Sequence, residues 1–392
     1  MSIAGPVDAT LRDRLSRYHF IRAGDEGIIF SPTSHHIHVL NHMATFIWLG
    51  FIEEERSIED LSRDLGEIYS LPKPILEEDI LQTIRYWDEM QSKEPYNDSP
   101  RLKQPTVCDR PPAHPDRAYV ELPNLTLEIT GFSSALLAPL REMLSSVSTT
   151  TTKPVDHVVQ ITAHGAGYKI CWQGHDLETA SCFEHIPAAL HRAVGQIACE
   201  HEDWLSILHA GAVIMDDQVL VFPAKSGSGK TTLMAALGAG GLGVLSDDAA
   251  PLTRDLTIAP LPIGMCIKEG AWKLLEPYYP DLRDKPIHDR IGAPIKYLLP
   301  SYTTTKPQHL RVDALIVPTR TPGRTTAQLS EISPIEAFSA IVSAESLLHK
   351  PLRQDDLQAL LDWLSAIQRF RLDYESLEGA IRAIRGLRLN SS

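Results

Sequence analysis

The chain has 392 residues, 43% of them hydrophobic, which is typical of a globular protein with two or three domains. No stretch approaches the roughly 18 apolar residues that a membrane-spanning helix needs, and the start lacks the apolar core of a signal peptide. The net charge of −13 argues against nucleic-acid binding, and five scattered cysteines without a Cys-x-x-Cys pair favour reduced thiols. We therefore expect a cytoplasmic protein that binds neither nucleic acid nor membrane.

The first part of the chain is acidic and is predicted to form a small domain over residues 1–92. It holds 8 Lys and Arg against 16 Asp and Glu, a net charge of −8, which gives either a solvated face or a surface that attracts a basic peptide. Residue periodicity predicts three strands and then three helices. Strands are expected over residues 18–22, 27–31 and 35–40, and helices over 41–52, from 57 until Pro72, and along the stripe Ile80, Ile84 and Trp87.

Residues 93–118 are rich in proline and poor in apolar side chains, which predicts an extended, semi-rigid linker. Residues 119–392 form the second predicted domain, in which strands and helices mix as in an α/β or α+β protein. Strands are expected over residues 119–129, 155–172, 208–215, 218–222, 242–245, 314–318 and 369–374, and helices over 187–199, after residue 229, and over 355–365 and 376–385.

A glycine- and serine-rich loop at residues 224–231 lies between a predicted buried strand and a predicted helix. Backbone N–H groups of such a loop, with the helix N-terminus, wrap the phosphates of a nucleotide. Lys230 is expected to contact the β- and γ-phosphates, and Thr231 to hold Mg²⁺ through its hydroxyl. Ala224 replaces the first glycine of the motif and fits only with a negative φ. The predicted nucleotide-binding residues are Ser226, Gly227, Ser228, Gly229, Lys230, Thr231 and Thr232.

Two aspartates, Asp247 and Asp248, follow the strand predicted over residues 242–245. The short connection from the loop predicts that this strand lies beside the loop strand, with both carboxylates near the phosphates. One carboxylate can reach Mg²⁺, and the other can accept the proton of an attacking hydroxyl. His209 lies just before the loop strand, where it is either a structural or a catalytic residue.

The order of these residues resembles the HPr kinase/phosphorylase family, which shares its fold with ATP-dependent phosphoenolpyruvate carboxykinases. The matching segments are His209-Ala210-Gly211, the loop from Ser226 to Thr231, and Ser246-Asp247-Asp248. The resemblance implies that Asp247 is the general base, that Asp248 helps with metal or orientation, and that His209 and Lys230 lie at the transferred phosphate.

The chain departs from that family after the aspartates, because it lacks the Arg-Gly-Leu-Gly signature of the HPr kinases. HPr itself is therefore not the expected substrate, and the chain is more similar to the HPr-kinase-related proteins encoded near peptide-modification genes. Lys268, Arg290 and Lys296 are candidate phosphate contacts, with ordinary surface charge as the alternative.

The first domain resembles PqqD, a winged-helix peptide chaperone, in Gly27-Ile28-Ile29-Phe30 leading to Val39-Leu40-Asn41 and in the helix that Ser57 begins. The resemblance implies that this domain recognises the leader of a ribosomally synthesised precursor peptide by strand addition. The expected groove involves His36, His38, Ile80, Ile84 and Trp87, with core packing as the alternative for the apolar residues.

These features together predict a kinase that uses ATP or GTP with Mg²⁺ to phosphorylate a Ser or Thr hydroxyl of a precursor peptide, which the first domain recruits. Two alternatives stay open: a nucleotide-switched peptide chaperone or scaffold without kinase activity, and a small-molecule kinase. Assembly into a homo-oligomer is possible, as in the HPr kinases.

Overall fold

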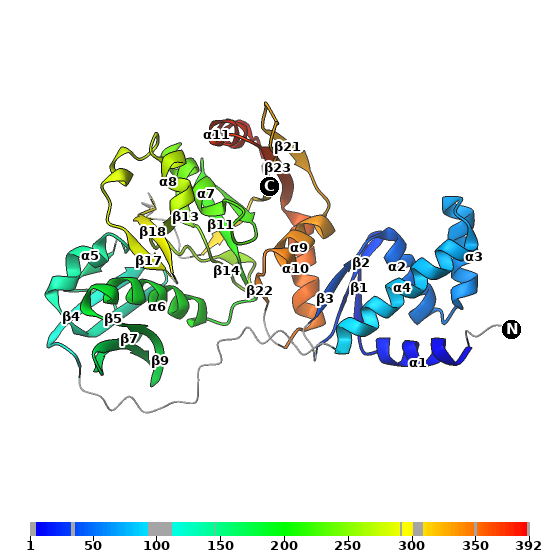
Figure 1. The fold of residues 1–392 in the computed structure, drawn as a ribbon, viewed down its shortest axis with the longest axis horizontal. Coiled ribbons are helices and arrows are strands. Elements are labelled where there is room, and N and C mark those ends of the chain that lie inside the picture. The colour runs from blue at the N-terminus through cyan, green and yellow to red at the C-terminus, as the bar shows by residue number, and fades with distance from the viewer. Residues whose placement is uncertain are drawn as a thin grey trace. The chain divides into compact units, whose positions relative to one another are not determined.

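The computed structural model describes residues 5–32, 36–92, 112–144, 146–290, 292–300, 309–348 and 351–389. Its described part is a mixed α/β structure with several sheets (Figure 1). Contacts between Cα atoms divide the chain into two compact units. The first unit comprises residues 1–99, 333–342 and 348–365, and the second comprises residues 100–332, 343–347 and 366–392. The predicted linker falls largely outside the described residues, since residues 93–111 are not among them.

The first unit begins with a helix that the sequence analysis did not predict, and then follows the predicted order of strands and helices. The three strands form an antiparallel sheet in the order β1-β2-β3. Its elements are α1 (Gly5–Leu15), β1 (His19–Ala23), β2 (Glu26–Phe30), β3 (Ile37–Leu40), α2 (His42–Trp48), a short π-helix (Leu49–Glu53), α3 (Ile58–Tyr69) and α4 (Lys73–Ser92).

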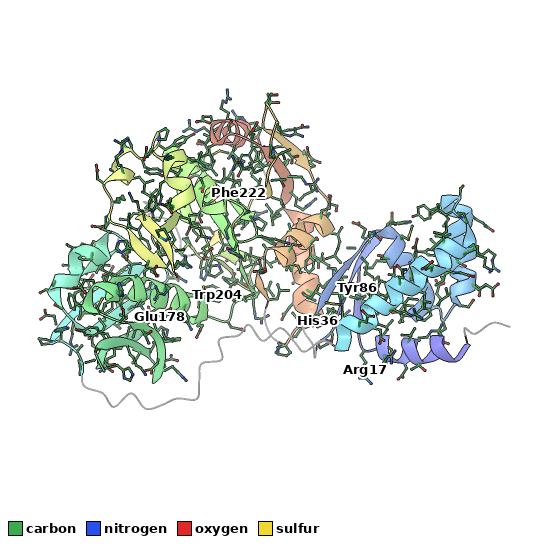
Figure 2. The ribbon with its side chains drawn as sticks, viewed as in Figure 1. Arg17, His36, Tyr86, Glu178, Trp204 and Phe222 are labelled. Atoms are coloured by element: carbon green, nitrogen blue, oxygen red, sulfur yellow. The ribbon has the colours of Figure 1, made fainter. Side chains whose placement is uncertain are left out.

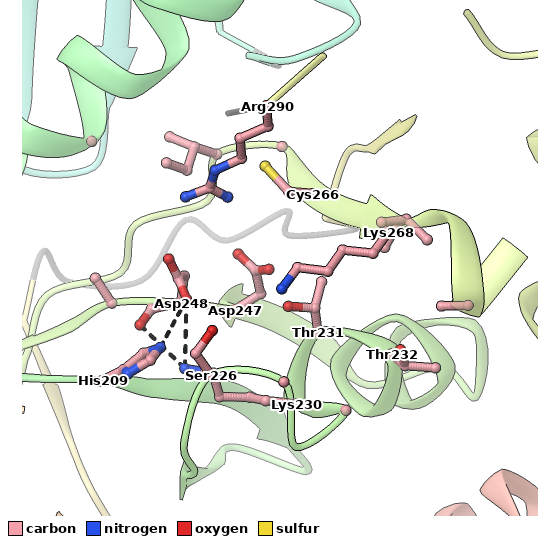
Figure 3. A pocket seen from close by; sticks show the side chains of 18 of the residues that line it. His209, Ser226, Lys230, Thr231, Thr232, Asp247, Asp248, Cys266, Lys268 and Arg290 are labelled. Atoms are coloured by element: carbon pink, nitrogen blue, oxygen red, sulfur yellow. Dashed lines mark hydrogen bonds and ion pairs between the residues drawn. The ribbon is translucent and has the colours of Figure 1, made fainter. Parts of the chain in front are cut away.

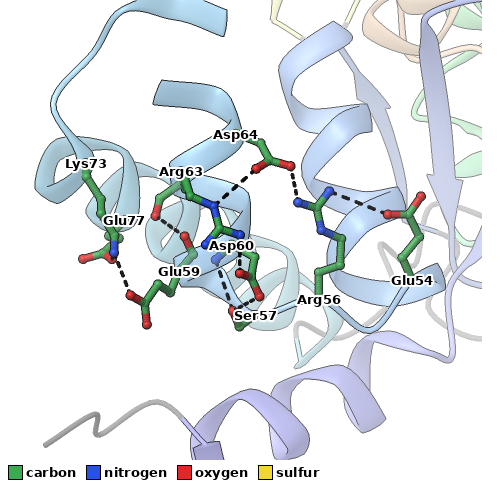
Figure 4. Close-up of polar contacts among 10 residues, drawn as sticks. Glu54, Arg56, Ser57, Glu59, Asp60, Arg63, Asp64, Lys73 and Glu77 are labelled. Atoms are coloured by element: carbon green, nitrogen blue, oxygen red, sulfur yellow. Dashed lines mark hydrogen bonds and ion pairs between the residues drawn. The ribbon is translucent and has the colours of Figure 1, made fainter. Parts of the chain in front are cut away.

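Polar side chains fix where the helices of the first unit begin. Asn41 caps α2, since its side-chain oxygen accepts a hydrogen bond from the Ala44 N–H at 2.9 Å. Ser57 caps α3 by accepting from the Asp60 N–H at 3.1 Å (Figure 4). The apolar faces then bury a core in which the rings of Trp48 and Trp87 meet edge to face at 5.4 Å.

Two later helices, α9 (Pro334–Ser343) and α10 (Gln354–Ala366), belong largely to the first unit by their contacts. The division made from the sequence placed both with the second domain. Chain order alone does not show that a segment more than two hundred residues away groups with the front of the chain.

The second unit opens with a six-stranded sheet, in the order β6-β4-β5-β7-β8-β9, against which α6 packs. Each long strand predicted in this region is a hairpin, because the backbone turns between residues 122 and 125 and between 164 and 167. The elements are β4 (Asp116–Leu122), β5 (Leu125–Phe132), α5 (Leu137–Arg141), β6 (Val147–Ser148), β7 (His157–His164), β8 (Gly167–Trp172), β9 (His175–Ala180) and α6 (Ile186–Glu200).

A second six-stranded sheet has the order β13-β11-β12-β20-β23-β21. It carries the glycine- and serine-rich loop at residues 224–231, hereafter the phosphate loop. The predicted hairpin is present: β11 and β12 are joined at Asp216 and Asp217, with φ of 47° and 72°. Its strands are β11 (Ala210–Met215), β12 (Gln218–Pro223), β13 (Gly243–Ser246), β20 (Ala314–Arg320), β21 (Gln328–Glu331) and β23 (Gln368–Tyr374), and α7 (Lys230–Ala239) and α11 (Leu377–Gly386) pack in its core.

The position of β13 corrects one expectation. β13, the strand before the aspartates, pairs with β11 and not with β12, the strand before the phosphate loop. β11 therefore lies between β13 and β12. The chain crosses over β11 through α7 and returns parallel to β12, because β12 and β13 are both antiparallel to β11.

Short strands complete the second unit around this sheet. One further sheet contains β19-β15-β14-β10, and another has the order β16-β18-β17. Their bounds are β10 (Ser206–Leu208), β14 (Ala250–Leu252), β15 (Thr257–Ile258), β16 (Met265–Lys268), β17 (His288–Arg290), β18 (Ala293–Leu298) and β19 (Leu310–Arg311), and α8 (Glu269–Leu275) follows β16.

Candidate active site

The phosphate loop connects the end of β12 to the start of α7. Gly227 and Gly229 have φ of 81° and 91°, a left-handed backbone that glycine adopts without strain. Gly229 is the residue before the first turn of α7, so the free N–H groups of that turn face the loop. Ala224 is buried and is not among the described residues with positive φ, as its side chain requires. The loop backbone therefore has the form that a phosphate cradle needs.

Lys230 extends from the first residue of α7 toward the aspartates. Its side chain is buried, with 5% exposed, and Nζ lies 3.6 Å from Asp248 Oδ1 and 3.5 Å from the Asp248 carbonyl oxygen. Burial lowers the pKa of Lys230 from its ordinary value. A phosphate arriving at the loop would give this buried ammonium group a second anionic partner beside Asp248.

His209 links the site to a second segment of the unit. Its Nδ1 lies 2.7 Å from the Ala344 carbonyl oxygen and its Nε2 lies 3.1 Å from Asp248 Oδ1. Both ring nitrogens therefore face oxygen atoms that can accept a hydrogen bond. The backbone N–H of His209 also donates to Ser346 Oγ at 3.0 Å. The ring is therefore held at both ends, with its Nε2 edge at the aspartates (Figure 3).

The two aspartates differ in their proton affinity. Asp247 is buried, and burial together with the charge of Asp248 raises its pKa to about 7. The hydrogen bond from His209, with the charge of Lys230, holds the pKa of Asp248 well below its usual range. Asp247 is thus the carboxyl group that can take up a proton near neutral pH, while Asp248 stays ionised.

The three candidate phosphate contacts have different surroundings. Arg290 lies in the cavity wall and points its guanidinium toward Asp248 (Figure 3). Lys268 reaches toward Thr231 and Asp247 from the end of β16 (Figure 3). Lys296 is buried elsewhere: Nζ donates to the Leu282 and Arg283 carbonyl oxygens at 2.8 and 2.7 Å and lies over the ring of Trp272. Lys296 is therefore not placed to contact a phosphate in the cavity, contrary to the prediction.

One cavity of about 800 Å³ brings most of the predicted residues together. This volume lies within the range of about 300–1,000 Å³ usual for small-molecule sites. The predicted residues that line the cavity are His209, Ser226, Gly227, Gly229, Lys230, Thr231, Thr232, Asp247, Asp248, Lys268 and Arg290. Ser228, also predicted to bind nucleotide, is exposed at the loop tip, and Lys296 does not line the cavity.

The oxygen atoms around the cavity suit a magnesium ion that arrives with a nucleotide. Mg²⁺ is usually held by one or two carboxylates, with phosphate oxygens and water completing its octahedron. The Thr231 hydroxyl and the Asp247 and Asp248 carboxylates offer such oxygen ligands beside the loop. Within the described residues no group of three or more His, Cys, Asp or Glu side chains is placed to hold a metal alone.

The residues predicted for peptide binding divide into two sets. Ile80, Ile84 and Trp87 are at most 2% exposed and form the core of the first unit, so their side chains offer no surface to a peptide. His38 on β3 is half-buried, and its ring lies 5.7 Å from that of Tyr86 on α4. Burial, with His36 nearby, lowers the pKa of His38 to about 4. Figure 2 places His36 and Tyr86 in this part of the first unit.

Sequence reasoning missed two groups of residues. The first is Tyr86, which is 53% exposed beside β3. It does not belong to the apolar stripe of α4, and that stripe was the only signal that the sequence offered for this helix. The cavity is also lined by α6, through Arg192, Gly195, Gln196 and Cys199. These α6 positions carry no motif, although their spacing of three and four residues marks one helix face.

No family model matches the chain, and no curated protein matches its sequence. None of the helices in the described ranges is long and apolar enough to cross a lipid bilayer.

Proposed function

We propose that the protein is an HPr-kinase-like P-loop kinase that transfers the γ-phosphoryl group of ATP to a Ser or Thr hydroxyl of a ribosomally synthesised precursor peptide. The observation that carries the proposal is the meeting of Lys230, Thr231, Asp247 and Asp248 in one cavity. A nucleotide-binding loop alone needs no second carboxylate with a raised pKa, whereas transfer to an alcohol needs a proton acceptor.

The proposed chemistry follows from the environments of the side chains. The loop N–H groups and Lys230 hold the β- and γ-phosphates, and Mg²⁺ supplies charge neutralisation when it is bound with the nucleotide. The alcohol oxygen forms a bond to the γ-phosphorus as the bond to the ADP oxygen breaks. Asp247 accepts the alcohol proton. The hydrogen bond from His209 and the charge of Lys230 keep Asp248 ionised, so its carboxylate can act as a ligand of Mg²⁺.

Arg290 has a part in this scheme. Its guanidinium lies in the cavity wall, where it interacts with the Cys266 side chain and with the charge of Asp248. A planar guanidinium binds two phosphate oxygens at once. Arg290 would therefore hold the transferred group on the side opposite to Lys230 (Figure 3).

The first unit supports the peptide part of the proposal. The strand β3 is at the edge of its sheet, in the order β1-β2-β3, and an extended peptide can pair with such an edge. His38 and Tyr86 lie together beside that edge, where they could contact a bound leader. The net charge of −8 over residues 1–92 favours a leader with basic residues.

The test compares Asp247→Asn with Asp255→Asn, a control at an exposed position of the same unit. Loss of the general base should lower phosphoryl transfer about 10²–10⁴-fold. Calorimetric titration should give ATP affinities within a few-fold of the unmodified protein for both variants, because the asparagine keeps the shape of the site. Transfer that persists in Asp247→Asn would remove Asp247 as the base. ATP binding without transfer in the unmodified protein would instead favour a nucleotide-switched scaffold.

A further inference from the structure

The helix α6 has a second face that the proposed chemistry does not use. Ile186, Ala193 and Ile197 belong to the core formed with the first sheet of the second unit. On another side of the helix, Gly195, Gln196 and Cys199 line the cavity of the phosphate loop. These residues recur at helical spacing, so the helix presents a continuous stripe to the cavity.

The stripe on α6 lies at the aspartate end of the cavity. The charge of Asp248 reaches Cys199, where it adds to burial in raising the pKa of that thiol to about 12. His191, one turn before Gly195 on α6, lies with its Nε2 2.9 Å from the Gly264 carbonyl oxygen. In the same segment the Leu261 N–H donates to Ser246 Oγ at 3.0 Å, so residues 261–264 join α6 to the chain beside Asp247. The α6 stripe therefore borders the place where the γ-phosphoryl group must be for Asp247 to act.

The opposite end of the cavity is formed by α8. Thr232 on α7 lies on the side away from His209 (Figure 3), and α7 contacts α8. Leu274 on α8 lines the cavity and is 47% exposed. If the γ-phosphate lies beside the aspartates, the triphosphate runs back along the loop and leaves the nucleoside at this end.

We propose that the stripe of Gly195, Gln196 and Cys199 on α6 is the acceptor wall of the kinase, along which an uncharged aliphatic alcohol reaches Asp247 while the nucleoside lies against α8. This inference rests on the proposed kinase function and adds to it the wall along which the acceptor arrives and the place of the nucleoside in the cavity.

The wall is uncharged and narrow. The Cys199 thiol is neutral, and the Gln196 amide donates to Glu200 at 3.0 Å. Arg192, the cation of this face, is neutralised by Glu178 at 2.7 Å. A Cβ atom on Gly195 would come within 3.3 Å of Ile263 Cδ1, so Ile263, which also lines the cavity, packs closely against the wall at this position. These features suit the short side chains of serine and threonine better than the ring of tyrosine or an anionic group.

The position of the nucleotide is tested by thiol labelling of Gln196→Cys and Leu274→Cys in the full chain, followed by mass spectrometry. A non-hydrolysable ATP analogue with Mg²⁺ should slow labelling at position 274 at least 10-fold and change labelling at position 196 less than 2-fold. The reverse pattern, or equal protection at both positions, would overturn the proposal.

The acceptor is tested with Gln196→Trp and with Gln328→Trp, a matched control on exposed β21 outside the cavity. The probes are acetyl-Gly-Ser-Gly-amide and its Thr and Tyr counterparts at millimolar concentration. Gln196→Trp should lower transfer to the Ser probe at least 10-fold and leave the Kd for ATP within 3-fold, and the unmodified protein should prefer Ser and Thr over Tyr.

Unchanged transfer in Gln196→Trp, or an equal loss of ATP binding, would overturn the acceptor wall and leave the kinase proposal intact. An unmodified protein that binds ATP but transfers phosphate to no alcohol would contradict the proposed function itself, and the acceptor wall with it.

Discussion

Asp247 and Asp248 are neighbours in the chain and yet have opposite proton affinities. The first is buried, whereas the second receives a hydrogen bond from His209. The sequence identified both as site residues from their place after a strand. That place alone did not separate their roles, which came only from the family resemblance, because burial and the hydrogen bond from His209 arise only when β11 and β13 pair.

Lys230 gives a prediction about nucleotide affinity. Replacing it with Met keeps most of its length and apolar stem but removes the charged hydrogen bond to phosphate. Hydrogen bonds to charged groups contribute about 1.5–3 kcal/mol, which corresponds to roughly 10–100-fold in the Kd for ATP. The Kd is measured by calorimetric titration with Lys153→Met, at an exposed position of the second unit outside the cavity, as the control. Equal affinity in Lys230→Met and the unmodified chain would exclude the expected phosphate contact.

His191 gives a prediction about stability and pH. Burial, with Arg290 and Arg192 nearby, lowers its pKa in the folded chain from 6.5 to about 4. Between these values the unfolded chain binds more protons, so the free energy of unfolding falls as the pH drops from about 6.5 to 4. The loss attributable to this residue should reach about 2 kcal/mol at pH 5.

This contribution is measured by denaturant unfolding at pH 7 and pH 5. His191→Gln keeps an N–H donor for the Gly264 carbonyl oxygen and should remove most of the pH dependence. His164→Gln, at an exposed position, should leave it unchanged. An unaltered pH dependence in His191→Gln would show that other groups carry it.

Elements were predictable where the signal is local. The caps at Asn41 and Ser57, the turn at Asp216 and Asp217, and the strand–loop–helix of the phosphate loop all rest on residues close in sequence. Pairing order was not predictable, and β13 lies beside β11 because the crossover through α7 spans one strand. A helical stripe also cannot distinguish a core from a groove, which is why Ile80, Ile84 and Trp87 were assigned to a peptide surface.

The Ser57 cap of α3 should contribute to the stability of the first unit. Ser57→Ala removes the acceptor for the Asp60 N–H and should lower the free energy of unfolding of the first unit by about 1 kcal/mol. Ser57→Asn, which can also cap, is the matched control and should cost only a few tenths of a kcal/mol. Hydrogen exchange of the first turn of α3 provides a local readout, and equal protection in both variants would show that the cap is not needed.

The whole molecule joins a peptide-recognition unit to a kinase unit in the proposed function. Tethering raises the effective concentration of a bound substrate to about the millimolar range. Weak contacts in the cavity then suffice, provided that the leader binds the first unit. Tyr86→Ala should therefore raise the KM for a full precursor without changing kcat, and should leave a substrate lacking its leader unaffected. Tyr69→Ala, at an exposed tyrosine of α3, is the control. A change in kcat would show that Tyr86 does not act through binding of the leader alone and would contradict this prediction.

The central claim, phosphoryl transfer to a peptide alcohol, is tested most directly by the intact mass of a candidate precursor peptide whose leader binds the first unit. The peptide is incubated with the full protein, ATP and Mg²⁺, and then fragmented to locate any modification. The account predicts a mass gain of one phosphate on a Ser or Thr, absent with Asp247→Asn. A peptide of unchanged mass, recovered from a mixture in which the protein demonstrably binds both ATP and the leader, would contradict it.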